Sequence, residues 1–308
     1  MPGLFSTRRG VGGGFLAVPR VLKALVPFCA LVTVSLLGAS LEAACAPKAP
    51  QATQSEAPKT TQAKAPQALA WPQPDCGSPT DDISFWNDVK SATPANPGQK
   101  LKKVVFPNND RNLGYAIHKA TDYNYLLIPT IRESGIECPN LLDSGAPNYF
   151  QFAFENISLL PQGTDWALGI ESAQRRGRNQ FHIHVSRLTA EARTELNNQT
   201  NSISEDESKW STTTITITNA AQQTGQQQIK FRAWSAPNVE ENLFVLLNKD
   251  IVMPRQQQKV NVAMGDETLL VVPDNTGKRL IILNSDEKSP DTQPGADNIE
   301  FLLNKADT

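Results

Sequence analysis

Residues 180–186 read QFHIHVS, and their alternation of polar and apolar side chains predicts a β-strand. Side chains two residues apart project from the same face of a strand. The predicted polar face therefore carries Gln180, His182, His184 and Ser186. The other face carries three apolar residues, which indicates a half-buried strand whose polar side lines a cleft or faces solvent. The chain has three histidines, so two of the three lie on this one strand.

The segments around this strand predict an α+β fold with an antiparallel sheet. The sequence indicates helices over residues 84–92, 148–160 and 188–203. It indicates further strands over residues 113–120, 123–130, 165–172, 211–218, 229–234, 243–248, 259–264, 268–273 and 278–284. The sequence contains no internal repeat of fixed period, which argues against a solenoid or propeller.

The overall composition is that of an ordinary globular protein. The chain has 308 residues, of which 39% are hydrophobic, and its 29 basic and 31 acidic residues give a net charge of −2. This near-neutral balance removes any bulk electrostatic argument for nucleic-acid binding. Composition alone therefore identifies no partner.

The first 45 residues predict export from the cytoplasm. Basic residues precede an uncharged apolar run over 24–40, and small residues follow in LEAAC, which ends at Cys45. The run is short for a membrane span of about 20 residues, so we expect cleavage of the signal rather than a permanent anchor. Cys45 after two alanines resembles the lipobox of bacterial lipoproteins, and both a lipid-anchored form and a simple cleaved form fit. Residues 46–75, rich in Ala, Pro and Gln, are expected to be a flexible linker before a folded domain over 76–308.

Two cysteines, Cys76 and Cys138, fall within the expected folded domain. In an exported domain, two thiols can pair as one disulfide. The alternative is that both remain unpaired.

The histidine pair is compatible with three roles. The histidines can bind a metal, although a zinc site needs a third ligand, and His118 lies on a different predicted strand. They can be surface residues without a role. One of them can be a nucleophile that attacks phosphorus, because a neutral imidazole is both a nucleophile and a good leaving group.

A basic loop before the strand favours the phosphorus chemistry. Arg175, Arg176 and Arg178 can hold phosphate oxygens bidentately, although such a loop can also be merely solvated. The sequence has no Gly-rich phosphate loop and no obvious carboxylate cluster for magnesium. Nucleophilic catalysis by histidine needs neither, and the residues present require no metal or other cofactor.

Two stretches resemble the histidine-triad superfamily. QFHIHV is similar to its signature strand, and YNYLLIPTIRES (123–134) is similar to an early strand of that superfamily, with Pro129 matching a proline and Arg132 in place of a histidine. The segments 125–143, 146–154 and 181–196 resemble one member family more closely, the bacterial CDP-diacylglycerol pyrophosphatases. The resemblance implies a histidine-triad-like fold and hydrolysis of CDP-diacylglycerol to CMP and phosphatidate. It also implies an enzyme associated with the membrane surface outside the cytoplasm.

The triad of that superfamily is reduced here to a pair, which leaves two registers open. In one, Gln180 replaces the first histidine and His182 is the nucleophile; in the other, His184 is the nucleophile and Ser186 replaces the last histidine. The two residues after a triad are expected to be apolar, and Val185 and Ser186 of the first register suit this better than Arg187 and Leu188 of the second. Gly177 is correctly spaced only in the second register, and we favour His182. Glu171 stands where many relatives have Asn.

The resemblance also implies a mechanism and substrate contacts. The nucleophile forms a nucleotidyl-histidine that water hydrolyses, while the other histidine and Gln180 or Ser186 contact the non-bridging oxygens. Arg132 and the arginines of 175–178 are candidates for contacts to the diphosphate or the headgroup. Two other interpretations remain: a domain that binds a nucleotide or lipid headgroup without turnover, and an exported hydrolase of other nucleoside diphosphate conjugates.

Overall fold

The computed structural model describes residues 76, 84–219, 227–286, 288 and 298–306, all within one compact unit, Lys64–Thr308. The expected export signal (1–45), the lipidation candidate Cys45 and the linker (46–75) lie outside these residues. Among the helices of the described segments, none combines the length and apolarity that crossing a bilayer requires.

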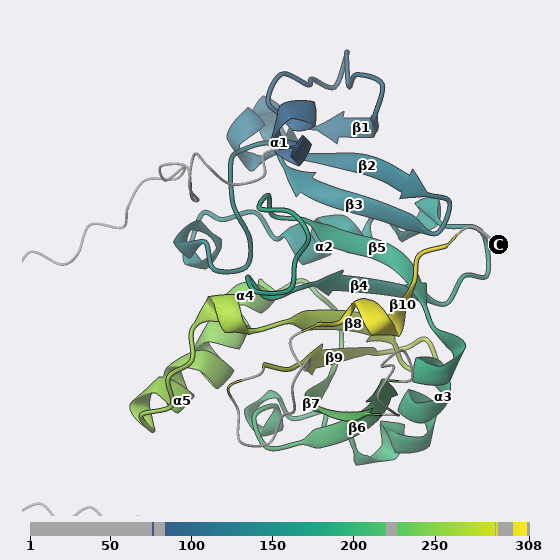
Figure 1. Ribbon diagram of the computed structural model, residues 1–308, viewed down its shortest axis with the longest axis vertical. Coiled ribbons are helices and arrows are strands. Elements are labelled where there is room, and N and C mark those ends of the chain that lie inside the picture. Colours follow the sequence, from purple (N-terminus) through teal and green to yellow (C-terminus); the bar gives the residue numbers. More distant parts are fainter. Residues whose placement is uncertain (1–75, 77–83, 220–226, 287, 289–297, 307–308) are drawn as a thin grey trace, which may run out of the picture. The chain divides into compact units, whose positions relative to one another are not determined.

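Within the described residues, ten strands form a single antiparallel sheet. In chain order they are β1 (Leu101–Val105), β2 (Tyr115–Thr121), β3 (Asn124–Pro129), β4 (Trp166–Ile170), β5 (Ile183–Leu188), β6 (Thr214–Asn219), β7 (Gln227–Ala236), β8 (Leu269–Pro273), β9 (Leu280–Asn284) and β10 (Leu303–Asn304). Their order across the sheet is β1-β2-β3-β5-β4-β8-β9-β7-β6, as Figure 1 shows, and the short β10 pairs with β5. The helices are α1 (Ser84–Val89), α2 (Tyr149–Phe154), α3 (Ala190–Gln199), α4 (Leu243–Leu247) and α5 (Met253–Gln257). The expected α+β class with an antiparallel sheet is confirmed.

The two faces of the sheet bury different apolar clusters. On one face, Ile183 and Val185 of β5 pack in a large cluster with Phe150 of α2 and Phe244 of α4. On the opposite face there are two clusters, one around Leu126 of β3 beneath α1 and one around Leu270 of β8 beneath α3. Since β5 lies between β3 and β4, its second face lies between these two clusters. The histidines project from that face.

Two of the predicted strands are wrong. Residues 243–248 (LFVLLN) form α4 and the first residue of the helical turn that follows it. Asn242 caps α4 by accepting a hydrogen bond from the backbone N–H of Phe244 at 3.0 Å, and a continuous apolar run does not distinguish a buried helix from a buried strand. Residues 259–264 are irregular, because Lys259 has a φ of 64° and Met264 begins a 3₁₀ turn. The sequence interpretation also missed β1 and β10.

Candidate active site

The histidine-bearing segment occupies the middle of the sheet. His184 lies on β5 opposite Leu126 of β3 and Gly169 of β4. His182 immediately precedes the strand, and Gln180 lies two residues earlier in a bend, so the strand begins later than QFHIHVS predicts. The rings of His182 and His184 are 5.2 Å apart between centroids, and these residues are 8% and 4% exposed. The two imidazoles thus form one buried pair.

The hydrogen bond at Nδ1 sets the tautomer of His182. Its Nδ1 lies 2.8 Å from the backbone carbonyl oxygen of Gln180. A carbonyl only accepts hydrogen bonds, so Nδ1 carries the proton and Nε2 keeps its lone pair. Burial lowers the pKa of His182, while the hydrogen bond to Gln180 and the charge of Glu300 raise it in part. The result is a neutral imidazole at neutral pH with a nucleophilic Nε2.

His184 is held in the same tautomer by a side chain. Its Nδ1 lies 3.1 Å from Oδ1 of Asn124, the first residue of β3. Its Nε2 is buried and has no hydrogen-bond partner among the described residues. Burial, followed by the charges of His182 and Lys305, holds the pKa of His184 well below its usual range.

The two residues that flank the pair are fully buried and hydrogen-bonded to backbone. Gln180 donates from Nε2 to the carbonyl oxygen of Ile131 at 3.3 Å, and Ser186 donates from Oγ to the carbonyl oxygen of Tyr123 at 2.7 Å. The Ser186 hydroxyl proton is therefore committed to the backbone. The prediction that all four residues lie on one strand is correct for His184 and Ser186, which are on β5, and wrong for Gln180 and His182, which precede it.

The C-terminal segment crosses to the histidine face, where Figure 1 shows it in yellow beside β4, β5 and β8. Gly169 makes this approach possible, because a Cβ at that position would lie 2.3 Å from Cδ1 of Ile299. Glu300 follows, with its Oε1 3.7 Å from Nε2 of His184, and it also contacts Nζ of Lys305. Glu171, one residue after β4, completes a group in which one ligand atom each of Glu171, His184 and Glu300 lie within 4.8 Å of one another.

The arginines of the basic loop differ in their surroundings. Arg176 is held by Glu137 through hydrogen bonds of 2.5 and 2.8 Å, and its Nε donates to Asn179 at 2.9 Å. The Arg176 side chain is 9% exposed and packs over Gly135, where a Cβ would lie 2.3 Å from its Nη1. Within this loop, the side chain of Arg176 is therefore largely buried beside Glu137, and Arg175 and Arg178 are exposed.

Arg132 lies apart from the loop, directly after β3. It is half-buried, and its carbonyl oxygen accepts a hydrogen bond from the backbone N–H of Cys76 at 3.1 Å. The backbone carbonyl oxygen of the next residue, Glu133, accepts a hydrogen bond from the backbone N–H of Phe181 at 2.6 Å. The IPTIRES segment thus contacts the residues that lead into β5.

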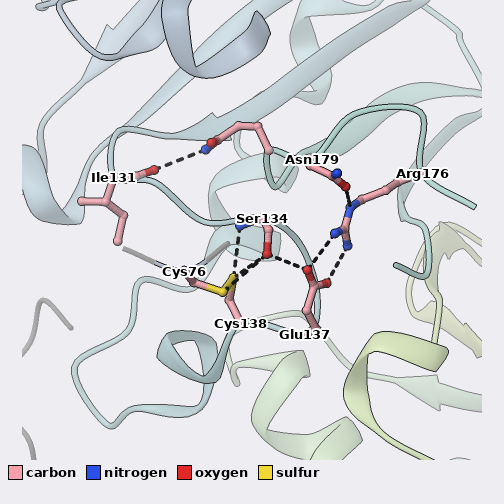
Figure 2. The surroundings of a disulfide bond; sticks show 8 residues. Cys76, Ile131, Ser134, Glu137, Cys138, Arg176 and Asn179 are labelled. Carbon is pink, nitrogen blue, oxygen red and sulfur yellow. Dashed lines mark hydrogen bonds and ion pairs between the residues drawn. A yellow bond between two sulfur atoms is a disulfide. The ribbon is translucent and has the colours of Figure 1, made fainter. Parts of the chain in front are cut away.

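Figure 2 shows a disulfide between Cys76 and Cys138, close to Ser134 and Glu137. Ser134 lies beside both sulfurs and donates from Oγ to Glu137 at 2.6 Å. Because Glu137 holds Arg176, a continuous chain of contacts runs from the disulfide to the loop before the histidines.

Sequence interpretation missed Asn124, Glu300 and Lys305. Asn124 is the second residue of the predicted strand 123–130, and nothing in the local sequence indicates that it contacts a histidine. Glu300 and Lys305 are 116 and more residues from His184 in sequence, so no spacing rule connects them with it. Glycine inside the predicted strand 165–172 was the available signal that another segment comes close at that point.

The fold and site together define an antiparallel α+β protein with a buried pair of histidines, one on β5 and one immediately before it. Comparison with known sequences identifies the protein family. Residues 83–303 match the CDP-diacylglycerol pyrophosphatase family, and the chain belongs to that family. A CDP-diacylglycerol pyrophosphatase of Yersinia pestis is 38% identical over 92 residues, which cover 27% of this chain and 36% of that relative. The alignment thus spans about a third of the relative's length.

Proposed function

We propose that this protein hydrolyses the diphosphate of CDP-diacylglycerol to CMP and phosphatidate. Family membership supports the substrate and the reaction class. The main structural support for the proposed chemistry is the tautomer of His182. Its Nδ1 donates a hydrogen bond to a backbone carbonyl, so Nε2 holds a lone pair. A buried neutral imidazole in this state is suited to attack phosphorus at neutral pH.

The proposed reaction has two displacements. Nε2 of His182 attacks the cytidylyl phosphorus, the bond to the bridging oxygen breaks, and phosphatidate leaves with the electron pair. Water then attacks the nucleotidyl-histidine, its proton is lost, and CMP leaves as the P–N bond breaks. Each step inverts at phosphorus, so the sequence as a whole retains configuration.

Two contacts favour His182 over His184 as the nucleophile. The hydroxyl of Ser186 is committed to the Tyr123 carbonyl, which disfavours the register in which Ser186 contacts the substrate. In the other register, Gln180 and His184 flank His182, and both lie beside it in the described structure. Both registers assume a distant relationship with the histidine-triad superfamily, which we include in the proposal.

The remaining expectations concern binding and location. Arg132, Arg175 and Arg178 are proposed to contact the diphosphate or headgroup, whereas the pairing of Arg176 with Glu137 supports a structural role for that residue. We further propose that the protein acts at the membrane surface outside the cytoplasm, with residues 1–45 as its export signal. Lipid attachment at Cys45 and cleavage without lipid remain the two forms of that proposal.

The test is rapid acid-free quenching of enzyme with CDP-diacylglycerol labelled on the cytidylyl phosphate. We expect acid-labile, base-stable label on the protein, absent from His182→Ala together with turnover. His184→Ala is expected to retain label while releasing CMP slowly, and His118→Gln serves as the histidine control. Turnover without label in the wild-type protein would refute the covalent mechanism.

A second comparison tests the substrate. The purified protein is assayed with CDP-diacylglycerol in mixed micelles and with CDP-choline at equal concentration. We expect kcat/KM to favour the lipid substrate. Equal or greater activity on CDP-choline would instead identify a hydrolase of soluble conjugates, and binding without turnover of either would identify a binding domain.

A further inference from the structure

Three side chains converge at β5, two from residues 171–184 and one from the C-terminal segment. Glu171 is 3% exposed, His184 is 4% exposed, and Glu300 reaches them from the C-terminal segment. One donor atom from each lies within 4.8 Å of the other two. This set combines one imidazole nitrogen with two carboxylate oxygens, all of which are ligands that zinc takes in proteins.

The unpartnered nitrogen of His184 indicates what the group is arranged to hold. Oδ1 of Asn124 only accepts, so Nδ1 of His184 carries the proton and Nε2 presents a lone pair. That lone pair is buried without a hydrogen-bond partner among the described residues and faces Oε1 of Glu300 at 3.7 Å. A lone pair and a carboxylate repel one another unless a cation or proton lies between them.

The support behind His184 matches that of a metal ligand. Histidines that bind metals almost always donate their second N–H to an oxygen, which fixes the ring and the tautomer. Asn124 makes this contact at 3.1 Å from the first residue of the neighbouring strand. The backbone that carries Glu300 is likewise fixed, because Ile299 packs against Gly169.

We propose that Glu171, His184 and Glu300 bind one divalent cation of the zinc class. In tetrahedral zinc geometry, ligand atoms about 2.1 Å from a shared ion lie about 3.4 Å apart, so donor atoms within 4.8 Å of one another need to contract by up to about 1.4 Å. Three protein ligands leave the open position that is typical of catalytic zinc sites. On the function proposed above, a phosphate oxygen of the substrate occupies that position, which is a contact that Nε2 of His184 in this tautomer does not make by itself.

The ammonium group of Lys305 competes with a bound cation for the carboxylate of Glu300. The ammonium contacts Glu300, and the two carboxylates of the group outnumber this single positive charge. Removal of the ammonium leaves all three ligands in place and frees Glu300 for the ion. The Lys305→Ala protein is therefore expected to bind the cation several-fold more tightly.

Binding is measured by calorimetric titration of chelator-treated, dialysed protein with Zn²⁺ alone. We expect one equivalent to bind the wild-type protein. Glu171→Gln and Glu300→Gln, which keep the side-chain shape, are expected to weaken binding by more than about 100-fold, and Asn124→Ala by about 10- to 100-fold. His118→Gln controls for adventitious histidine binding and is expected to bind as the wild type does.

Circular dichroism of each variant establishes that it is folded before it is titrated. Absence of binding to the wild-type protein overturns the proposal, as does unchanged affinity in both glutamine variants. If Glu171→Gln does not fold, Glu300→Gln and the tighter binding of Lys305→Ala decide the matter in the same way. The titration contains no substrate, so its outcome is separate from the labelling of His182 that tests the proposed function.

Discussion

Glu133 is expected to make the stability of this protein fall as the pH rises. Glu133 is completely buried, and this burial raises the pKa of its carboxyl group from 4.5 to about 8. The hydroxyl of Tyr149 lowers this pKa and offsets only part of the rise. Between these two values the folded protein holds a proton that the unfolded chain has released. Folding stability therefore declines with rising pH through this window, at a rate approaching about 1.4 kcal/mol per pH unit. Glu133→Gln replaces the neutral carboxyl with a neutral amide of similar shape and removes the dependence.

The magnitude follows from the size of the window. From pH 4.5 to pH 7 the group accounts for about 3 kcal/mol of lost stability, since titration in the unfolded chain is already half complete at the lower pH. The free energy of unfolding of Glu133→Gln, minus that of the wild type, is thus expected to grow by about 3 kcal/mol over this range. Urea denaturation followed by tryptophan fluorescence at the two pH values, at constant ionic strength, measures this difference.

The matched control is Glu240→Gln, at an exposed glutamate. Surface substitutions of this kind change stability by no more than about 0.5 kcal/mol, and we expect the same small value at both pH values. A difference between Glu133→Gln and the wild type that is constant with pH, or that shrinks as the pH rises, would show that Glu133 is not protonated in the folded protein.

Two further perturbations test the framework around the site. Cys138→Ser removes a disulfide that closes a 62-residue separation, and it is expected to cost about 4 kcal/mol in urea denaturation; dithiothreitol should lower the wild-type midpoint and leave that of the variant unchanged. Arg232→Met leaves the buried carboxylates of Glu267 and Asp286 short of one guanidinium, and it is expected to cost about 3–5 kcal/mol in the same assay. A loss below 1 kcal/mol in Arg232→Met would mean that these carboxylates find protons or other partners.

Features set by residues close together in the sequence were predictable, and features set by contacts between distant segments were not. Alternation along β5 and the apolar hairpin of β2 and β3 depend on neighbouring residues, and both were predictable. The run LFVLLN was assigned to the wrong class because it has no period of its own. Its helix is selected by the Asn242 cap and by burial against α2, and only the first of these is visible locally.

The candidate site divides in the same way. The proximity of His182 to His184 was predictable from their spacing of two residues, although only His184 lies on β5. The state of each imidazole is set by the Gln180 carbonyl and by Asn124, and the second of these contacts exists only because β3 pairs with β5. Gly169 illustrates the limit: a glycine within a strand indicates that something approaches closely, but the identity of that segment depends on a chain reversal more than a hundred residues later. Gly169→Ala would therefore displace Glu300 from His184 without altering any residue of the histidine motif.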